Sequence, residues 1–310
     1  MKTTTIKGVA ISALSLGTVQ LGVDYGINNK GGKPSLETAF NILDSAIENG
    51  INTLDTAAGY GDSEAVIGKW LATKDPADHP FIVTKIYELD HSSLDALRVS
   101  VRTKVEESKK RLGLSQIPLL MLHRFDDYLN DKENMVTVIN ELKASGDILY
   151  SGVSVYSNSD YDVVANSGFD SVQLPLNIFD NSQVVNGGIE KIRKAGMMIF
   201  IRSVYLQGLV FRDPDKLEPH MQFCRDTLVK FRALCAKYDL SPAALAISYV
   251  ASLKGFTSLV LGCETVDQVK SNVELMESIT QLTDEQINEI HEAFKDSPRT
   301  LLDPGLWPKG

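Results

Sequence analysis

Residues 51–64 read INTLDTAAGYGDSE, and this stretch shows the pattern that repeats along the chain. A short apolar run ends at the acidic Asp55, passes through a glycine-rich turn and leads into a segment with helical spacing. Residues 81–85 (FIVTK) and 118–123 (PLLMLH) follow the same plan, and each run ends on an ionisable side chain. Short strands that alternate with amphipathic helices are typical of βα units on a parallel sheet.

The alternation predicts eight strands. They are expected at residues 14–17, 52–55, 81–85, 118–123, 150–155, 171–174, 198–202 and 258–261. Amphipathic helices are predicted between them, including residues 36–48, 93–112, 132–144 and 267–278. A doubly wound sheet alternates in the same way, but the G-x-G-x-x-G fingerprint that usually follows its first strand is absent. The sequence therefore predicts an α/β fold of the (β/α)8 TIM barrel type, one domain that spans residues 1–310.

Composition indicates the class of protein and argues against several partners. Of the 310 residues, 43% are apolar and 23% are charged, which suits a folded domain with a sizeable core. The net charge of −9 repels a phosphate backbone, so no nucleic-acid partner is expected. No apolar run approaches the ~18 residues that a membrane helix needs, so no membrane partner is expected either. The sequence leaves the oligomeric state open.

Cysteine usage and the start of the chain indicate the compartment. The three cysteines, Cys224, Cys235 and Cys263, form no C-x-x-C pair, and free thiols in a reducing environment are expected. The first residues, MKTTTIKGVAISALSLG, have the early lysine and the apolar stretch of a signal peptide, but Lys7 and the serines interrupt that stretch. A cytoplasmic protein is expected.

Ionisable residues end three consecutive predicted strands. Asp55, Lys85 and His123 would meet at one mouth, because the carboxyl ends of barrel strands converge there. Each residue alone has a structural interpretation, as a helix cap, a strand-end charge or a hydrogen-bonded core histidine. Their arrangement on neighbouring strands favours catalysis. Two irregular segments, residues 23–34 and 210–220, are predicted to form loops over this site.

These segments resemble the aldo-keto reductase family. Residues 52–64 are similar to its signature of an Asp followed five residues later by a Tyr in a glycine-flanked turn, here Asp55 and Tyr60. Residues 81–85 resemble the strand of its catalytic lysine, and residues 119–124 resemble the strand of its histidine. The likeness extends over nearly the whole chain. It implies a barrel that reduces an aldehyde or ketone with NADP or NAD as cofactor.

The chemistry explains the grouping of these residue types. Carbonyl reduction needs a hydride on carbon and a proton on oxygen, and a tyrosine hydroxyl with an unperturbed pKa of about 10 is a poor acid at neutral pH. A buried lysine beside Tyr60 would favour the phenolate, and Asp55 would keep Lys85 charged. Neutral His123 would donate a hydrogen bond to the substrate carbonyl. The predicted catalytic residues are therefore Tyr60, Lys85, Asp55 and His123, without a metal.

The resemblance also implies a set of cofactor-binding residues. They are Gly17, Thr18, Asp55, Ser154, Gln173, Arg202, Ser203, Leu206, Gly208, Gly262, Glu264, Gln268 and Asn272. The chain departs from the family pattern at several of them. Val155 replaces an Asn, and Arg202 replaces the aromatic residue that stacks on the nicotinamide, although pairing of Arg202 with a carboxylate is an alternative.

The adenosine end of the predicted site indicates the choice of cofactor. Glu264 replaces the basic residue that often meets the 2′-phosphate of NADP, and Ser271 replaces a Glu. A carboxylate repels a phosphate but accepts a hydrogen bond from a ribose 2′-hydroxyl. Use of both cofactors with a preference for NAD is expected, unless Lys270 reaches back along its helix. Ordinary helix capping by Thr265 and Asp267 is the structural alternative for this segment.

Two other functions remain open. The first is a nucleotide-binding regulatory barrel that resembles the β-subunits of potassium channels. The presence of all four predicted catalytic residues, called the tetrad below, argues against it. A barrel hydrolase or isomerase that uses Asp55 and His123 is the second, and it leaves Tyr60 and Lys85 unexplained. The expected partner is a small-molecule carbonyl compound such as a sugar derivative. This expectation follows from aromatic and cationic residues predicted at the mouth, namely Tyr25, Tyr87, Arg124, Phe125 and Phe179.

Overall fold

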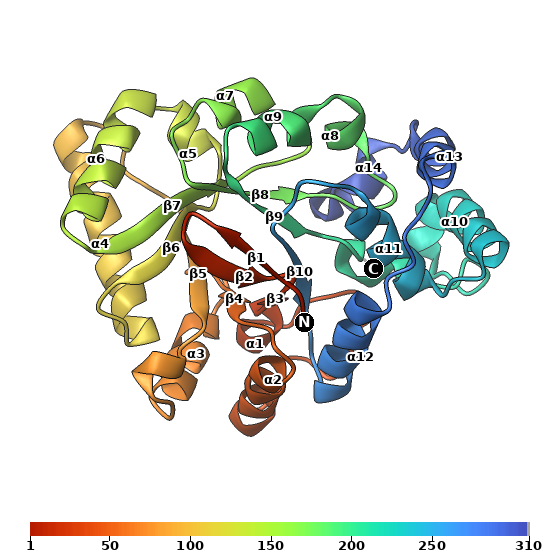
Figure 1. Ribbon diagram of the computed structural model, residues 1–310, viewed down its shortest axis with the longest axis horizontal. Helices are drawn as coiled ribbons and strands as arrows, with labels where there is room; N and C mark the ends of the chain where they lie inside the picture. Colours follow the sequence, from red (N-terminus) through yellow and green to blue (C-terminus); the bar gives the residue numbers. More distant parts are fainter. Residues whose placement is uncertain (309–310) are drawn as a thin grey trace.

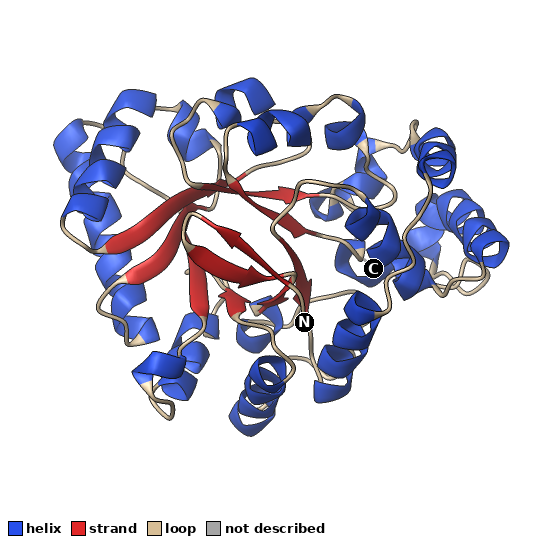
Figure 2. Cartoon of the chain, in the orientation of Figure 1, coloured by secondary structure: helices blue, strands red, loops and turns tan. Residues whose placement is uncertain are grey.

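Parallel pairing of consecutive apolar strands builds the fold. In residues 1–308, which the computed structural model describes, each barrel strand pairs with the next along the chain and the last pairs with the first (Figures 1 and 2). The closed barrel consists of β3 (Leu14–Gly17), β4 (Thr53–Asp55), β5 (Phe81–Ile86), β6 (Ile117–Leu122), β7 (Ile148–Ser154), β8 (Ser171–Pro175), β9 (Met198–Arg202) and β10 (Ser258–Gly262). The predicted (β/α)8 barrel is confirmed, with strand ends that differ by one or two residues.

Helices surround the barrel and connect its strands (Figure 2). The longer ones are α2 (Leu36–Glu48), α3 (Ser63–Leu71), α4 (Leu94–Leu112), α6 (Lys132–Ala144), α9 (Gly188–Lys194), α10 (Arg225–Tyr238), α11 (Pro242–Ser252), α12 (Val266–Glu277) and α13 (Asp284–Phe294). Short helical turns are α1 (Val19–Gly22), α5 (Asp126–Leu129), α7 (Tyr161–Ala165), α8 (Ser182–Val185), α14 (Arg299–Leu302), η1 (Pro76–Asp78), η2 (Leu206–Phe211), η3 (Pro219–Cys224) and η4 (Pro304–Leu306). No helix in residues 1–308 has the length and apolar character required to cross a bilayer.

Local chemistry marks where the helices begin and end. The hydroxyl of Ser93 accepts a hydrogen bond from the amide of Ala96 and begins α4, and Gly113 ends α4 in a left-handed conformation. The hydroxyl of Thr265 caps α12 by accepting from the amide of Gln268. Capping by Thr265, one of the two residues in the structural alternative for this segment, is therefore observed.

An antiparallel hairpin at the start of the chain was not predicted. It consists of β1 (Thr3–Ile6) and β2 (Val9–Ser12), and Figure 1 shows it across the barrel opening. Backbone and side-chain bonds between Ser12 and Asn52, which precedes β4, hold it at the end where the strands begin. The hairpin closes that end of the barrel, so the opposite end is the open mouth.

The barrel interior has its own apolar cluster, separate from the core between strands and helices. Its members are Ile11, Val83, Leu119, Met121, Met198, Phe200 and Val260. In β6 the alternation is direct, because Leu119 and Met121 lie in the interior cluster while Leu120 and Leu122 lie in the outer core. This alternation determines which residues at the strand ends point into the barrel.

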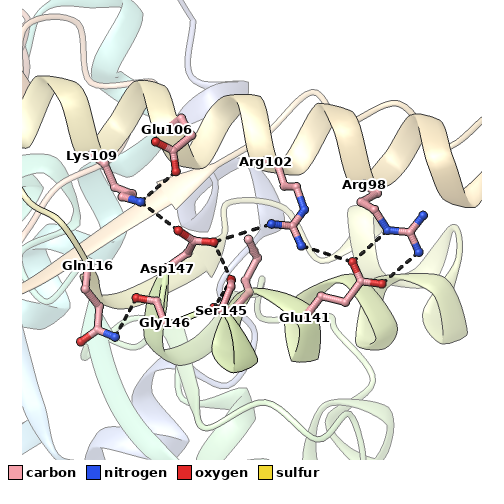
Figure 3. Close-up of polar contacts among 10 residues, drawn as sticks. Arg98, Arg102, Glu106, Lys109, Gln116, Glu141, Ser145, Gly146 and Asp147 are labelled. Atoms are coloured by element: carbon pink, nitrogen blue, oxygen red, sulfur yellow. Dashed lines mark hydrogen bonds and ion pairs between the residues drawn. The ribbon is translucent and has the colours of Figure 1, made fainter.

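A network of ion pairs joins α4 to α6 on the outside of the barrel. Glu141 of α6 accepts from Arg98 and Arg102, and Asp147 accepts from Lys109, as Figure 3 shows. Exposed pairs of this kind contribute little individually, and here several are joined in one network between neighbouring segments. These helices flank β6, the strand that leads to His123.

Candidate active site

Strand alternation brings the ionisable strand-end residues to the barrel axis. Val83 lies in the interior cluster, so Lys85, two residues later in β5, points inward as well. His123 continues the inward series of Leu119 and Met121, although it lies one residue beyond the end of β6 rather than inside the strand. Asp55 ends β4 at the same mouth.

Lys85 is completely buried and fully bonded. Its ammonium donates to both carboxylate oxygens of Asp55, at 2.8 and 2.9 Å, and to the carbonyl of Thr56 at 2.8 Å. Burial opposes the charge, but the Asp55 carboxylate and Tyr60 outweigh it and raise the pKa of Lys85 above its usual value. The ammonium lies 5.0 Å from the centre of the Tyr60 ring. Lys85 therefore places a permanent positive charge behind this tyrosine.

The turn that carries Tyr60 is locked by close backbone contacts. A Cβ on Gly22 of α1 would lie 1.7 Å from the Tyr60 carbonyl oxygen, so only glycine fits there. The hydroxyl of Ser63 accepts from Thr56 and donates to the carbonyl of Thr18, which ties the turn to the ends of β3 and β4. These contacts position the Tyr60 side chain independently of any ligand.

His123 lies between two tyrosines. Its ring meets Tyr60 and Tyr87 edge to face, with ring centres 5.6 and 5.8 Å apart. Burial, together with the positive charges of Lys85 and Arg202, lowers the pKa of His123 to about 3. The imidazole is therefore neutral at neutral pH, as the sequence predicted, and one ring nitrogen carries a hydrogen to donate.

A cavity of about 880 Å³ opens beside these residues. Tyr60, His123 and Asp55 line it, whereas Lys85 lies behind Asp55 and does not. Every residue that the resemblance implied for the cofactor also lines it. These residues are Gly17, Thr18, Asp55, Ser154, Gln173, Arg202, Ser203, Leu206, Gly208, Gly262, Glu264, Gln268 and Asn272.

Gln20 is a cavity residue that the sequence interpretation missed. Its side-chain oxygen is buried without a hydrogen-bond partner, although the residue lines the cavity. Gly262 of β10 lies against it, and a Cβ at this glycine would be 2.3 Å from the Gln20 amide nitrogen. A buried side-chain oxygen that has no partner and lies beside a glycine fits a ligand with hydroxyl or amide donors, such as a nicotinamide dinucleotide. No local pattern distinguishes Gln20 from an ordinary helix residue.

Two loops meet above the cavity. The amide of Ile27 donates to the carbonyl of Gln207, and the side chain of Asn28 donates to the carbonyl of Gly208 at 2.7 Å. The predicted loop at residues 23–34 is thus irregular and borders the cavity. The prediction for residues 210–220 is wrong in part, because Pro219 begins the helical turn η3, a position that suits proline.

Left-handed backbone is concentrated in the loop after β9. Ser203, Leu206 and Gln207 all have φ between 44° and 63°, and Gly208 follows with φ of 93°. Such conformations are costly for residues other than glycine and are found mainly at functional sites. Combined with neighbouring right-handed residues they can turn backbone N–H groups toward one side, an arrangement that binds anions.

The α12 side of the cavity is acidic. Glu264, Asp267 and Gln268 line it, and the amide of Glu264 donates to the side chain of Gln268. Burial and the nearby Asp24 raise the pKa of Glu264. Lys270, which the sequence offered as a compensating base, is exposed and does not line the cavity.

Asn272 is already engaged on both ends of its amide. Its oxygen accepts from the hydroxyl of Tyr205 at 3.0 Å, and its nitrogen donates to the thiol of Cys263. A primary amide carries a second N–H and a second lone pair, so Asn272 retains capacity for a ligand. Tyr205 of the loop after β9 lines the cavity as well, although it is not among the cofactor-binding residues named from the sequence.

Arg202 stacks on a protein side chain. Its guanidinium lies 5.5 Å from the ring centre of Tyr156 and donates to the carbonyl of Val155 and the hydroxyl of Ser203. The alternative in which it pairs with a carboxylate is not observed among residues 1–308. Residue 202, where the family pattern has an aromatic residue, is thus an arginine whose guanidinium lies over the ring of Tyr156.

The predicted mouth residues divide into two groups. Tyr25 lines the cavity, and Tyr87 and Arg124 contact each other beside His123. Phe125 and Phe179 are in the core, so their prediction was wrong. Phe179 packs between Phe231 and Phe294, and Phe125 stacks on Tyr128, because apolar rings are buried wherever helices offer partners.

The described residues contain no metal-binding cluster, and the cysteines form no disulfide. In the described part of the chain, no three His, Cys, Asp or Glu side chains are grouped to hold a metal ion. Cys224, Cys235 and Cys263 are free and buried.

Comparison with known proteins places these features in a family. The profile of the Aldo/keto reductase family matches residues 13–295. Norsolorinic acid reductase of Aspergillus flavus is 26% identical over an alignment of 312 positions that covers 92% of this chain and 78% of that protein. NADH-specific methylglyoxal reductase of Escherichia coli is 26% identical over an alignment of 300 positions that covers 86% of this chain and 90% of that protein.

A solved structure shares the barrel. An aldo-keto reductase from Bacillus halodurans, determined in its holo form, superimposes with a TM-score of 0.76 at 24% identity and covers 94% of this chain and 96% of its own. The family profile covers all eight barrel strands from β3 to β10 and the four residues at the mouth. The resemblance seen in the sequence is therefore confirmed, and the chain belongs to the aldo/keto reductase family of oxidoreductases.

Proposed function

We propose that the protein reduces small aldehydes or ketones with NADH in preference to NADPH, with Tyr60 as the proton donor. The observation that carries the proposal is Lys85, a buried lysine that Asp55 keeps charged directly behind Tyr60. This arrangement lies beside a cavity whose volume of about 880 Å³ is in the range of cofactor pockets.

Several cavity residues fit a nicotinamide dinucleotide. When bound, it supplies the hydride that adds to the carbonyl carbon. Ser154 and Gln173 would hold its carboxamide, since Gln173 uses its nitrogen on Asp55 and keeps its oxygen free to accept. The loop at residues 203–208 would bind the pyrophosphate through backbone N–H groups. Gln20 would accept from a ribose hydroxyl or an amide.

The tetrad then transfers a proton to the carbonyl oxygen. The Tyr60 hydroxyl donates its proton to the carbonyl oxygen as negative charge develops there. The Lys85 ammonium stabilises the phenolate that remains, and solvent later restores the proton. Neutral His123 donates a hydrogen bond to the same oxygen and fixes its position.

The charge of the cavity supports NADH as the preferred cofactor. Glu264 and Asp267 line its α12 side, with Asp24 close to Glu264, and no lysine or arginine among residues 1–308 lines that side. A 2′-phosphate placed there would meet only like charge, whereas a ribose 2′-hydroxyl can donate to a carboxylate. The Escherichia coli relative named for NADH-specific reduction of methylglyoxal supports the same preference.

The test uses NADH binding and turnover together. We expect purified protein to bind NADH, seen as a change in cofactor fluorescence, and to reduce members of a panel that includes methylglyoxal, benzaldehyde and simple sugars. Tyr60→Phe should retain NADH affinity while turnover falls by orders of magnitude, because the change removes the proton donor and little else. NADH binding without turnover of any carbonyl would favour a regulatory role. Undiminished turnover in Tyr60→Phe would exclude Tyr60 as the acid.

A further inference from the structure

Arg202 places an unneutralised positive charge at the catalytic end of the cavity. It continues the inward series of Met198 and Phe200 in β9. In the register of β8 with β9 it lies opposite Pro175, two residues beyond Gln173, whose amide contacts Asp55. Arg202 therefore lines the layer immediately above the tetrad, on the mouth side.

The contacts of Arg202 leave its charge intact. Its hydrogen-bond acceptors are a carbonyl and a hydroxyl, and its stacking partner Tyr156 is neutral. Its field still reaches the catalytic groups, because it contributes to the lowered pKa of His123. Elsewhere at this end, Asp55 and Lys85 neutralise each other and His123 is uncharged. Among residues 1–308, the cations without a carboxylate partner at this end are Arg202, which lines the cavity, and Arg124, which lies over the Tyr87 ring and does not line it.

The nicotinamide ring must lie at this end if the proposed function holds. The carbonyl oxygen has to reach the Tyr60 hydroxyl, and hydride transfer requires the donor and acceptor carbons to lie about 3–3.5 Å apart. The ring is neutral when reduced and carries one positive charge when oxidised. A nearby cation therefore interacts unequally with the two forms of the cofactor.

We propose that Arg202 biases this cavity toward the reduced cofactor, so that the protein binds NADH more tightly than NAD⁺ and works as a reductase rather than as an alcohol dehydrogenase. The inference rests on the proposed function and adds the direction of the reaction to it. The hydride leaves NADH for the carbonyl carbon, the proton leaves Tyr60 for the oxygen, and the oxidised cofactor is then repelled. Its release is favoured by the charge that it has just acquired.

The experiment measures two dissociation constants rather than turnover. NADH is titrated by its fluorescence, and NAD⁺ is titrated by displacement of NADH, in the wild type and in Arg202→Gln, which keeps the length and removes the charge. We expect Arg202→Gln to lower the ratio of the NAD⁺ constant to the NADH constant by on the order of tenfold, mainly through tighter NAD⁺ binding. For a two-electron couple this equals a shift of about 30 mV in the potential of the bound cofactor.

Two further variants separate charge from structure. Arg202→Lys keeps the charge and should retain most of the wild-type ratio. Arg102→Gln removes a cation from the α4 surface network and should leave the ratio unchanged. A ratio in Arg202→Gln within twofold of the wild type would overturn the inference, provided that both cofactors bind. An equal loss of affinity for both would also overturn it, because Arg202 would then be meeting the phosphates. Failure of the wild type to bind either nucleotide would instead refute the proposed function, and this inference with it.

Discussion

Lys85 shows at the scale of one residue how hydrogen-bond partners keep a buried amine charged. Desolvation opposes a buried ammonium, yet three acceptors from Asp55 and Thr56 surround it and its pKa is raised. A hydrogen-bonded pair of this kind is costly to break on one side only, because the remaining carboxylate of Asp55 would be buried without its partner. Structure and catalysis therefore depend on the same contact.

Replacement of Lys85 by Met tests its role in tuning Tyr60. We expect turnover to fall by orders of magnitude, and the loss of reduction rate at alkaline pH to move to higher pH, because the phenolate is no longer stabilised. The measurement is a pH profile of kcat with a saturating carbonyl substrate, alongside NADH affinity and thermal unfolding. A folded variant whose alkaline limb stays at the wild-type position would contradict the proposed coupling.

Glu264 governs cofactor choice if its carboxylate faces the ribose. Glu264→Arg should raise kcat/KM for NADPH by about tenfold or more and lower it for NADH, since the side chain would then attract a 2′-phosphate. Lys270→Gln is the matched control, because Lys270 does not line the cavity, and it should change neither value. A wild type that strongly prefers NADPH, with no response to Glu264→Arg, would place Glu264 away from the ribose.

At the scale of an element, the turn between β4 and α3 depends on its contact with α1. A Cβ at Gly22 would lie 1.7 Å from the carbonyl oxygen of Tyr60 and 2.6 Å from the amide of Ser63. Gly22→Ala must therefore displace the turn, and we expect a loss of stability of roughly 1–3 kcal/mol and a larger proportional loss of kcat than of NADH affinity.

Gly31→Ala, in the loop at residues 23–34, is the control for Gly22→Ala. Its Cβ would approach no atom closer than the Asn29 side-chain oxygen at 3.9 Å, so both stability and kcat should remain near the wild-type values. Urea unfolding and steady-state kinetics on the two variants provide the comparison. Equal behaviour of the two alanine variants would show that the turn tolerates displacement.

At the scale of the whole molecule, His123 makes folding depend on pH. Its folded pKa of about 3 lies below the ordinary value of 6.5, so the unfolded chain binds one more proton between these values. Stability is therefore fully present above about pH 6.5 and is lost as the pH falls toward 3. The contribution of this residue approaches about 1.4 kcal/mol per pH unit in the middle of that window.

Urea unfolding between pH 4.5 and 7 measures this dependence. We expect His123→Asn to reduce the slope of the unfolding free energy against pH by nearly one proton, relative to the wild type. The other carboxyl groups and histidines are common to both proteins and cancel in the difference. Parallel slopes would mean that folding does not lower the pKa of His123.

The local periodicities predicted the barrel correctly. Period-two runs located the strands, helical spacing located α2, α4, α6 and α12 to within a residue or two, and the order of the runs indicated parallel neighbours. The same alternation placed Asp55, Lys85 and His123 on the barrel axis, because every second side chain of a strand shares a face. These features depend on residues close together in the chain.

Contacts between distant segments determined the rest. The hairpin β1–β2, the bond from Asn28 to Gly208 and the unpartnered oxygen of Gln20 all arise where segments far apart in sequence meet. Phe179 was predicted at the mouth, yet it lies in the core because Phe231 and Phe294 approach it from helices far along the chain. The sequence alone determined the barrel and the identity of its inward strand-end residues, since both follow from local geometry. Only the tertiary structure decided which loops close over the cavity and which groups Arg202 contacts, because those features depend on packing partners that no local pattern reveals.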